Sequence, residues 1–333
     1  MVLVDSHPIR ERVFRSAAMR TEAGSTTLTF HAMGTLCRIS IFESPKTQGN
    51  AFFDNALKWV ADFESKFSRF LENSLINRIN NAAGREWVEI DAETERLLAM
   101  CGELRFFSRG VFDPTSLPLI RLWNWKANPS TIPSEQQIAD TRELVGWSRV
   151  QRKPGSVFLT RPGMCLDFGG IGKEYAVDNV AQMASQYQID HVLVDFGQDI
   201  RAFGHPPSKP AWHIGLENPQ QPGACWASLA ITQTAVATSG DYLRHSLING
   251  RRYGHIIDPR TGYPVDNGCL AVSVVAPSCT MAGILSTTAF ILGPREGYDL
   301  IHQTFGAAGA ILTANEKIIT PRLNEYLVQF NPR

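Results

Sequence analysis

The sequence predicts an α+β fold, in which largely antiparallel sheets pack against helices. Helix-like and strand-like segments are mixed along the 333 residues, and several strand-like segments are joined by turns too short to hold a crossover helix. These two observations favour α+β over a doubly wound parallel sheet. The composition, 44% hydrophobic and 19% charged, is typical of a folded globular chain that is long enough to bury a large core.

The first third of the chain shows both periodicities. Residues 27–43 alternate between polar and apolar side chains, and we expect strands there with an interruption near Met33-Gly34-Thr35. Residues 51–70 place large apolar side chains at helical spacing, and a second helix is expected at about 91–108.

The middle of the chain is less regular. The Pro- and Trp-rich stretch 113–133 is expected to be irregular, and a short helix should begin near Ser134. Residues 155–168 are expected to form a hairpin whose second strand ends at Asp167. A helix from Lys173 to Tyr187 should follow.

The C-terminal part is rich in strand patterns separated by turns. Strands are expected at 191–203, 211–217, 225–232 and 270–276. The stretch 269–293 carries no charge and is long enough to span a bilayer. Because Pro277 and Ser278 split it into a Val-rich half and an Ala/Leu/Thr-rich half, we expect a strand, a turn and a helix, and no membrane span.

We find no internal repeat, and the expected organisation is an N-terminal extension over 1–26, one domain over 27–320 and a tail over 321–333. Lys plus Arg equals Asp plus Glu, which argues against a nucleic acid or an anionic membrane as partner. The six cysteines are scattered without a C-x-x-C pair, and the N-terminus lacks the apolar core of a secretory signal. These features predict free thiols and a cytoplasmic location.

Two segments combine turn residues with reactive side chains. In "LDFGGIGKEYAVD", residues 166–178, a strand ends at Asp167, three glycines follow, and a helix begins at Lys173. This pattern fits a cradle for a diphosphate or a simple tight turn, and it is not a P-loop because Glu174 follows the lysine. In "HIIDPRTGYP", residues 255–264, an apolar run gives way to turn residues, and taken alone the segment favours an ordinary turn.

Three further segments are ambiguous. Phe70 follows a helix and could be core or a platform for a planar ring. Asp113-Pro114-Thr115 is a turn with a carboxylate. In "MAGILSTTAF", the hydroxyls of Ser286, Thr287 and Thr288 are expected to bond back to the preceding helical turn.

Seven segments taken in order resemble the FAD:protein FMN transferase (ApbE-type) family over residues 27–313. They are "MGTLCRISI", "FSRFLENSLINRIN", "FDPTSLPLIRLW", "LDFGGIGKEYAVDNVA", "VDFGQDIRAFG", "AVATSGDY" and "HIIDPRTGYPV". The resemblance implies a protein that binds FAD as its substrate and, with Mg²⁺, transfers the FMN half to a Thr or Ser of a target protein, releasing AMP. It also implies a flavin site in a cleft between sub-structures.

The resemblance assigns roles to particular residues. The implied FAD contacts are Met33, Phe70, Val111, Phe112, Asp113, Asp167, Lys173 and Ile256. The implied metal site lies between the backbone carbonyl of Gly170 and a helix that carries Asp-x-x-x-Thr, here ending at Thr287. His255 is the implied proton acceptor for the target hydroxyl, with Asp258, Arg260 and Thr261 shaping its turn.

The chain departs from the family pattern at three positions. Gly283 stands where the metal-binding Asp is usual, Glu174 where Gly is frequent, and Gln198 where the second Gly of Gly-Gly-Asp is common. Losing a carboxylate should weaken Mg²⁺ binding, since this ion is usually held by only one or two of them. Gly283→Asp is expected to be tolerated and to raise Mg²⁺ affinity.

Three functions therefore follow from the sequence. The first is a working transferase that holds its metal through Gly170, Thr287, the FAD diphosphate and a carboxylate from elsewhere. The alternatives are a non-transferring FAD-binding protein and an enzyme that hydrolyses FAD to FMN and AMP.

Overall fold

The computed structural model describes residues 7–42, 46–124, 132–241, 245–248 and 251–328. Its main element is a nine-stranded sheet in which every neighbouring pair is antiparallel. In spatial order its strands are β1 (Ala18–Glu22), β2 (Ser25–Ala32), β3 (Thr35–Phe42), β7 (His191–Phe196), β8 (Asp199–Phe203), β11 (Ala235–Gly240), β14 (Cys269–Ala276), β15 (Ala308–Thr313) and β16 (Lys317–Ile319). The predicted α+β class is confirmed.

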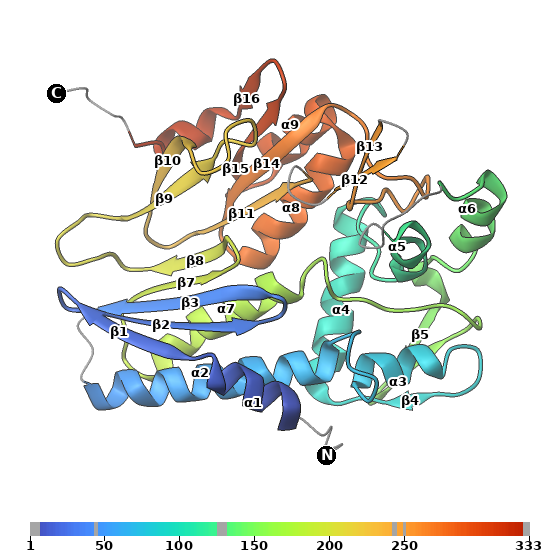
Figure 1. Cartoon of the computed structure of the whole chain (residues 1–333), viewed down its shortest axis with the longest axis horizontal. Helices are drawn as coiled ribbons and strands as arrows, with labels where there is room; N and C mark the ends of the chain where they lie inside the picture. Colours follow the sequence, from blue (N-terminus) through green and yellow to red (C-terminus); the bar gives the residue numbers. More distant parts are fainter. Residues whose placement is uncertain (1–6, 43–45, 125–131, 242–244, 249–250, 329–333) are drawn as a thin grey trace.

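Three small antiparallel sheets accompany the large one. They contain β4 (Val88–Glu89), β6 (Ser156–Leu159) and β5 (Val150–Lys153); β9 (Trp212–Glu217) and β10 (Cys225–Ile231); and β12 (His245–Ile248) and β13 (Arg251–Gly254). In Figure 1 the sheet β4-β6-β5 lies with several helices at one end of the molecule, away from most of the large sheet.

Helices cover the large sheet and also form most of the end of the molecule where the sheet β4-β6-β5 lies. They are α1 (His7–Arg15), α2 (Lys46–Phe67), α3 (Leu75–Asn81), α4 (Ala92–Phe107), α5 (Leu117–Trp123), α6 (Glu135–Arg142), α7 (Gly172–Gln186), α8 (Cys279–Leu292) and α9 (Pro294–Gln303), with short 3₁₀ helices at η1 (Trp147–Arg149) and η2 (Pro321–Glu325). Helices α7 and α8 lie against the large sheet, while α3, α5 and α6 belong to the helix-rich end (Figure 1).

Most predicted elements are found. The interruption expected in residues 27–43 is a two-residue turn between β2 and β3 in which Met33 and Gly34 both have positive φ, 50° and 73°. This geometry suits the twist of a hairpin. Ser134 caps α6 as expected, and residues 269–293 form a strand and a helix. Within the described part of the chain, no helix is long and apolar enough to cross a membrane.

Three predictions about local structure were wrong. The stretch 113–133 contains helix α5, since Pro118 fits the first turn of a helix and the apolar residues around it are buried. The hairpin expected at 155–168 is instead β5 with β6, and Cys165 makes only an isolated bridge with Ser116. The apolar run at 255–257, which looks like the end of a strand, is not one: β13 ends at Gly254, and Ile257 makes only an isolated bridge with Pro264.

The division into 1–26, 27–320 and 321–333 stays a prediction. Two elements fall before residue 27: strand β1 pairs with β2, and helix α1 packs on α2 and buries Val13. After residue 320, η2 contributes the buried Leu323.

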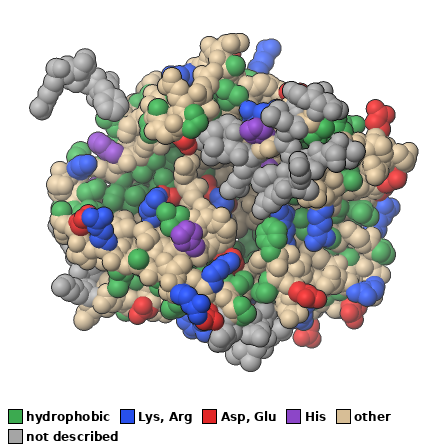
Figure 2. Space-filling view, in the orientation of Figure 1, with side chains coloured by type: hydrophobic (Ala, Val, Ile, Leu, Met, Phe, Trp, Pro, Cys, Tyr) green, Lys and Arg blue, Asp and Glu red, His purple; other side chains and the backbone are tan. Residues whose placement is uncertain are grey.

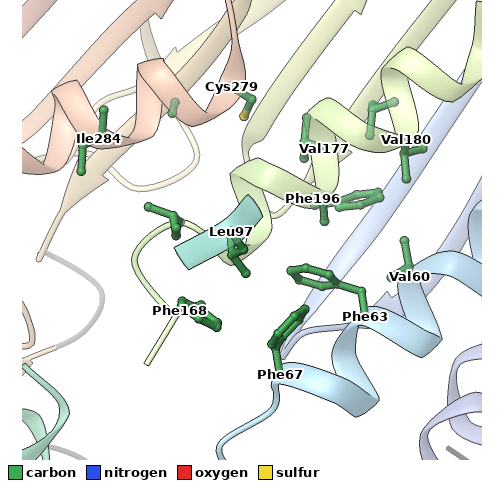
Figure 3. Close-up of a cluster of buried hydrophobic side chains, with 14 of the residues drawn as sticks. Val60, Phe63, Phe67, Leu97, Phe168, Val177, Val180, Phe196, Cys279 and Ile284 are labelled. Carbon is green, nitrogen blue, oxygen red and sulfur yellow. The ribbon is translucent and has the colours of Figure 1, made fainter. Parts of the chain in front are cut away.

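The main core lies between the large sheet and helices α2, α4, α7 and α8 (Figure 3). Aromatic side chains fill its centre in edge-to-face contacts. The ring centroids of Phe63 and Phe67 are 4.9 Å apart, and those of Phe67 and Phe168 are 5.3 Å apart. Because Phe168 belongs to the Gly-rich turn, this packing attaches the turn to α2.

One buried carboxylate ties α7 to α8. Asp178 Oδ1 accepts from the backbone N–H of Cys279 at 2.8 Å, and Oδ2 accepts from the N–H and the hydroxyl of Thr280, each at 2.8 Å. These are otherwise unsatisfied donors at the start of a helix, and the dipole there favours a negative charge. Asp178 also pairs with Arg201 at 3.5 Å.

We expect Asp178→Ala to lower the free energy of unfolding by about 2–4 kcal/mol, because it leaves three buried donors without their acceptor and the Arg201 guanidinium without its paired carboxylate. Urea denaturation followed by circular dichroism measures this change. The matched control is Asp54→Asn on the exposed face of α2, which should change the free energy by less than about 0.5 kcal/mol. An Asp178→Ala protein as stable as the control would contradict the role given to this cap.

Candidate functional site

The Gly-rich turn holds Asp167 in a fixed position. The Asp167 backbone N–H donates to Pro114 O at 2.8 Å, and Arg69 Nη1 donates to Asp167 Oδ2 at 2.7 Å. A Cβ added at Gly169 would lie 3.0 Å from that same oxygen. Burial raises the pKa of the Asp167 carboxyl, and the positive charges of Arg69 and Arg121 oppose the rise. Glycine at position 169 therefore leaves room for the carboxylate beside the turn.

Phe70 is an aromatic ring that the fold leaves open to solvent. It lies three residues after the end of helix α2 and is 78% exposed, and the Arg69 guanidinium lies 4.9 Å from its ring centroid. Since Arg69 also bonds Asp167, this ring stands beside the Gly-rich turn. Of the two possibilities left by the sequence, core residue or platform, the exposure favours the platform.

The Val111-Phe112-Asp113 segment lies against the same turn. All three residues are buried, and a Cβ at Gly170 would lie 3.4 Å from the Phe112 ring. Asp113 accepts hydrogen bonds from Arg105 Nε at 2.9 Å, from the Thr115 N–H and hydroxyl at 2.9 and 2.6 Å, and from the Trp147 N–H at 3.2 Å. Its carboxylate thus holds the segment together through contacts within the protein.

Met33 occupies the tip of the β2–β3 hairpin, next to helix α2. Its backbone N–H donates to Glu64 Oε2 at 2.9 Å, and Glu64 pairs with Arg12 at 2.6 Å. The side chain of Met33 is partly buried against the main core.

Lys173 lies in the first turn of α7 and contacts the buried carboxylate of Asp199. Burial would lower the pKa of Lys173, but the negative charges of Asp199 and Glu174 outweigh it and raise the pKa. Lys173 is therefore a fixed positive charge at the positive end of the α7 dipole. An anionic ligand is stabilised by both.

Glu174, the next residue, is buried beside Gly283 of α8. A Cβ built at Gly283 would lie 2.6 Å from Glu174 Cγ and 2.9 Å from Glu174 Oε1. Burial raises the pKa of the Glu174 carboxyl, Asp199 adds to the rise, and Lys173 opposes it. Glu174 Oε2 finds no hydrogen-bond partner among the residues that the structure describes.

This contact corrects one expectation. Gly283→Asp is not accommodated while Glu174 keeps its position, because the new Cβ would overlap the middle of the glutamate side chain. The sequence suggested an empty place at position 283, and the structure shows that the place is filled from the neighbouring helix.

Thr287 lies one helical turn beyond Gly283. Its hydroxyl is 2.9 Å from Ser239 Oγ on β11, which is also 2.9 Å from Ser286 Oγ. Ser286 donates back to Gly283 O at 3.0 Å, as expected for a helix-interior serine. Thr287 differs, because its hydroxyl contacts the neighbouring strand β11.

The His255–Pro264 segment forms a compact turn on the helix-rich end. Asp258 forms a two-pronged pair with Arg260, whose Nη2 lies 2.8 Å from Oδ2. The Gly262 carbonyl accepts from Trp123 Nε1 at 2.8 Å, and Ile257 packs with α5 and α6 residues. Asp258 is thus part of the turn that positions the partly buried His255 and Ile256.

The structure joins several of the predicted residues through others that the sequence reasoning did not single out. Arg69 links Phe70 to Asp167, Asp199 holds Lys173, and Ser239 meets Thr287. Asp199 lies in the motif "VDFGQDI" and Ser239 in the motif "AVATSGDY". These two motifs were the sequence signal from which both residues could have been named. The space-filling view is hollowed near the middle of one face, with Lys and Arg side chains around it (Figure 2).

A metal at this site would need mixed ligands. No group of three or more His, Cys, Asp or Glu suited to a metal occurs in the described ranges. The predicted set combines a backbone carbonyl at Gly170 with the Thr287 hydroxyl, and oxygen ligands of this kind suit Mg²⁺. The roles of the predicted site residues stay predictions.

Comparison with known proteins accounts for this arrangement. A relative from Haemophilus influenzae named FAD:protein FMN transferase is 27% identical over 315 residues, 91% of each chain. One of the same name from Klebsiella pneumoniae is 32% identical over 252 residues, 74% of this chain and 77% of the relative. The crystal structure of the ApbE protein from Thermotoga maritima matches with a TM-score of 0.83 at 29% identity, over 91% of this chain and 99% of that one. The model of the ApbE family matches residues 33–312, and the chain therefore belongs to that family.

Proposed function

We propose that this protein transfers FMN from FAD to a Thr or Ser hydroxyl of a target protein and releases AMP. The relatives named FAD:protein FMN transferase support the reaction class. The observation in this chain that carries the proposal is the position of Lys173 at the start of α7, directly after the Gly-rich turn, where Asp199 pairs with its ammonium group. A diphosphate placed there meets a positive charge and the N-terminal end of a helix.

The flavin ring is assigned to the exposed Phe70. Stacking on Phe70 would place the flavin beside Asp167, and the backbone of the Gly169-Gly170 turn allows close approach of the ligand. Met33, Val111, Phe112, Asp113 and Ile256 are proposed to shape this pocket. Asp113 acts through the segment that it holds.

In the transfer step, the target hydroxyl oxygen forms a bond to the FMN phosphorus, and the bond from that phosphorus to the bridging oxygen breaks, leaving AMP. We assign His255 as the acceptor of the hydroxyl proton at a ring nitrogen, because an imidazole suits general-base work near neutral pH. Asp258 keeps the turn under His255 in place through Arg260. Lys173 stabilises the negative charge on the diphosphate.

The residues present fit a divalent cation. A buried carboxyl oxygen, Glu174 Oε2, lacks a partner among the described residues beside Gly283, and a cation bound there would satisfy it. We propose that Mg²⁺ is held by the Gly170 carbonyl, the Thr287 hydroxyl and the FAD diphosphate. When bound, Mg²⁺ supplies charge neutralisation at the diphosphate.

We also propose a cytoplasmic location, supported by the free thiols. All six cysteines are unpaired, and five of them are buried.

Incubation with FAD, Mg²⁺ and a peptide that carries an acceptor Thr should give covalent flavin on the peptide and one AMP per transfer, read by mass spectrometry and chromatography. His255→Ala should slow the transfer by about 10²–10⁴-fold, the usual contribution of a general base. FAD binding should be unchanged. FAD that binds without reacting would favour the non-transferring binding protein, and FMN with AMP but no flavinylated peptide would favour the hydrolase.

We expect Phe70→Ala to weaken FAD binding about tenfold, since stacking on an aromatic side chain contributes roughly 1–3 kcal/mol. Titration calorimetry measures the affinity, and wild-type protein should bind FAD more tightly than FMN. The control is Phe106→Ala, which removes another exposed phenylalanine, 87% exposed, at the end of α4. An equal loss of FAD affinity in the two variants would count against the proposal that the flavin ring stacks on Phe70.

Thiol titration should find six reactive cysteines after unfolding without reductant. In the native protein only the exposed Cys225 should react quickly, because burial raises the pKa of Cys37 and of Cys269 to about 12 and so suppresses the thiolate. Fewer than six thiols in the unfolded protein would argue against a reducing compartment.

A further inference from the structure

We infer that Glu174 of α7 supplies the metal-binding carboxylate that position 283 of α8 does not. The inference rests on the proposed transferase function, and it concerns which helix carries the acidic ligand. The chain has Gly283 where the family pattern that it resembles has an acid, and Glu174 fills the space in front of that glycine.

The first argument is spatial. A Cβ at Gly283 would lie 2.9 Å from Glu174 Oε1. If residue 283 were an aspartate, its carboxylate oxygens would lie two bonds from that Cβ, at a distance of roughly 2.4 Å. The glutamate therefore brings an oxygen to nearly the same distance from the α8 backbone that an aspartate of α8 would provide.

The second argument is the state of that carboxylate. Glu174 is only 7% exposed, and its Oε2 has no hydrogen-bond partner within the described residues. A buried carboxylate oxygen without a partner is costly, and the group either takes up a proton or gains a hydrogen bond, a basic side chain or a metal ion. The nearest base, Lys173, contacts Asp199. A divalent cation would satisfy the free oxygen.

The third argument is the register between the two helices. Asp178 bonds Cys279 and Thr280 at the start of α8. Glu174, one turn before Asp178 on α7, contacts Gly283, one turn after Cys279 on α8. Thr287 lies one turn after Gly283 on α8, and Gly170 lies four residues before Glu174, just ahead of the start of α7. Glu174 and Gly283 therefore stand next to the two residues that are proposed to bind the metal.

The test measures metal binding directly. Mn²⁺ serves as the probe because it accepts the same oxygen ligands as Mg²⁺, and its free form is read by electron paramagnetic resonance. ADP is added because it carries the adenosine and diphosphate of FAD, and binding of Mn²⁺ to ADP alone is subtracted. Glu174→Gln should weaken Mn²⁺ binding at least about tenfold.

Two readouts separate a ligand from a structural residue. The melting temperature of metal-free Glu174→Gln should not fall, because glutamine keeps the side-chain volume and can donate as well as accept hydrogen bonds in the buried site. The control Glu93→Gln removes a carboxylate that pairs with Lys66 at 2.7 Å, and it should leave Mn²⁺ affinity unchanged.

The sharpest variant moves the acid between helices. Glu174→Gly should bind Mn²⁺ weakly, and Glu174→Gly with Gly283→Asp should return to within about threefold of wild type, because the carboxylate then comes from α8. Gly283→Asp alone should lower the melting temperature through its overlap with Glu174.

Wild-type affinity in Glu174→Gln, no recovery in the double variant, or no Mn²⁺ binding by wild type with ADP would each overturn the inference. The proposed function fails separately. Loss of Mn²⁺ binding in Glu174→Gln together with an inactive wild type would leave the inference standing and remove the transferase. If wild type transfers FMN and Glu174→Gln binds Mn²⁺ as tightly as wild type, the transferase stands and the inference about Glu174 fails.

Discussion

The buried contact between Asp178 and the first residues of α8 is the constraint on which the site depends. It joins Asp178 of α7 to Cys279 of α8, 101 residues later in the chain, and it satisfies three donors at once. Because the contact is directional, it fixes how far α8 can slide or rotate against α7. Every later pairing between these helices, including that of Glu174 with Gly283, follows from this register.

The same register concentrates charge at the start of α7. Lys173 and Glu174 are adjacent in sequence, and Asp199 from β8 lies close enough to influence both. Without a ligand, Lys173 pairs with Asp199, and burial raises the pKa of Glu174, so that its carboxyl favours the protonated, neutral form. A site of this kind gains most from a cation bound together with a diphosphate, since the cation balances the acids and Lys173 balances the phosphate.

The sequence predicted the α+β class and the elements with clear periodicity. The β2–β3 hairpin, α2, α4 and the β14–α8 unit were found because apolar spacing determines them locally. Helix α5 was missed because Pro118 and two tryptophans suggested irregular structure, whereas burial of Leu119 and Trp123 decides the local fold. Strands β11, β15 and β16 lacked distinctive turn signals. Propensity does not reveal such elements, since pairing with neighbours stabilises them.

The site shows the same limit at the level of single residues. Phe70, Asp167 and Lys173 could be named from the sequence because each stands in a recognisable segment, but Arg69 and Asp199 matter through contacts that only the fold creates. The sequence differs from the family pattern that it resembles at 174, where an acid is gained, and at 283, where an acid is lost. Along the chain these two differences looked independent. In three dimensions they are one change, because the side chain of Glu174 occupies the volume that Gly283 leaves. The affinity for a cation depends on where the ligand oxygen atoms lie, whichever helix carries them. Metal binding at this site therefore depends on residues 174 and 283 together and not on either residue alone.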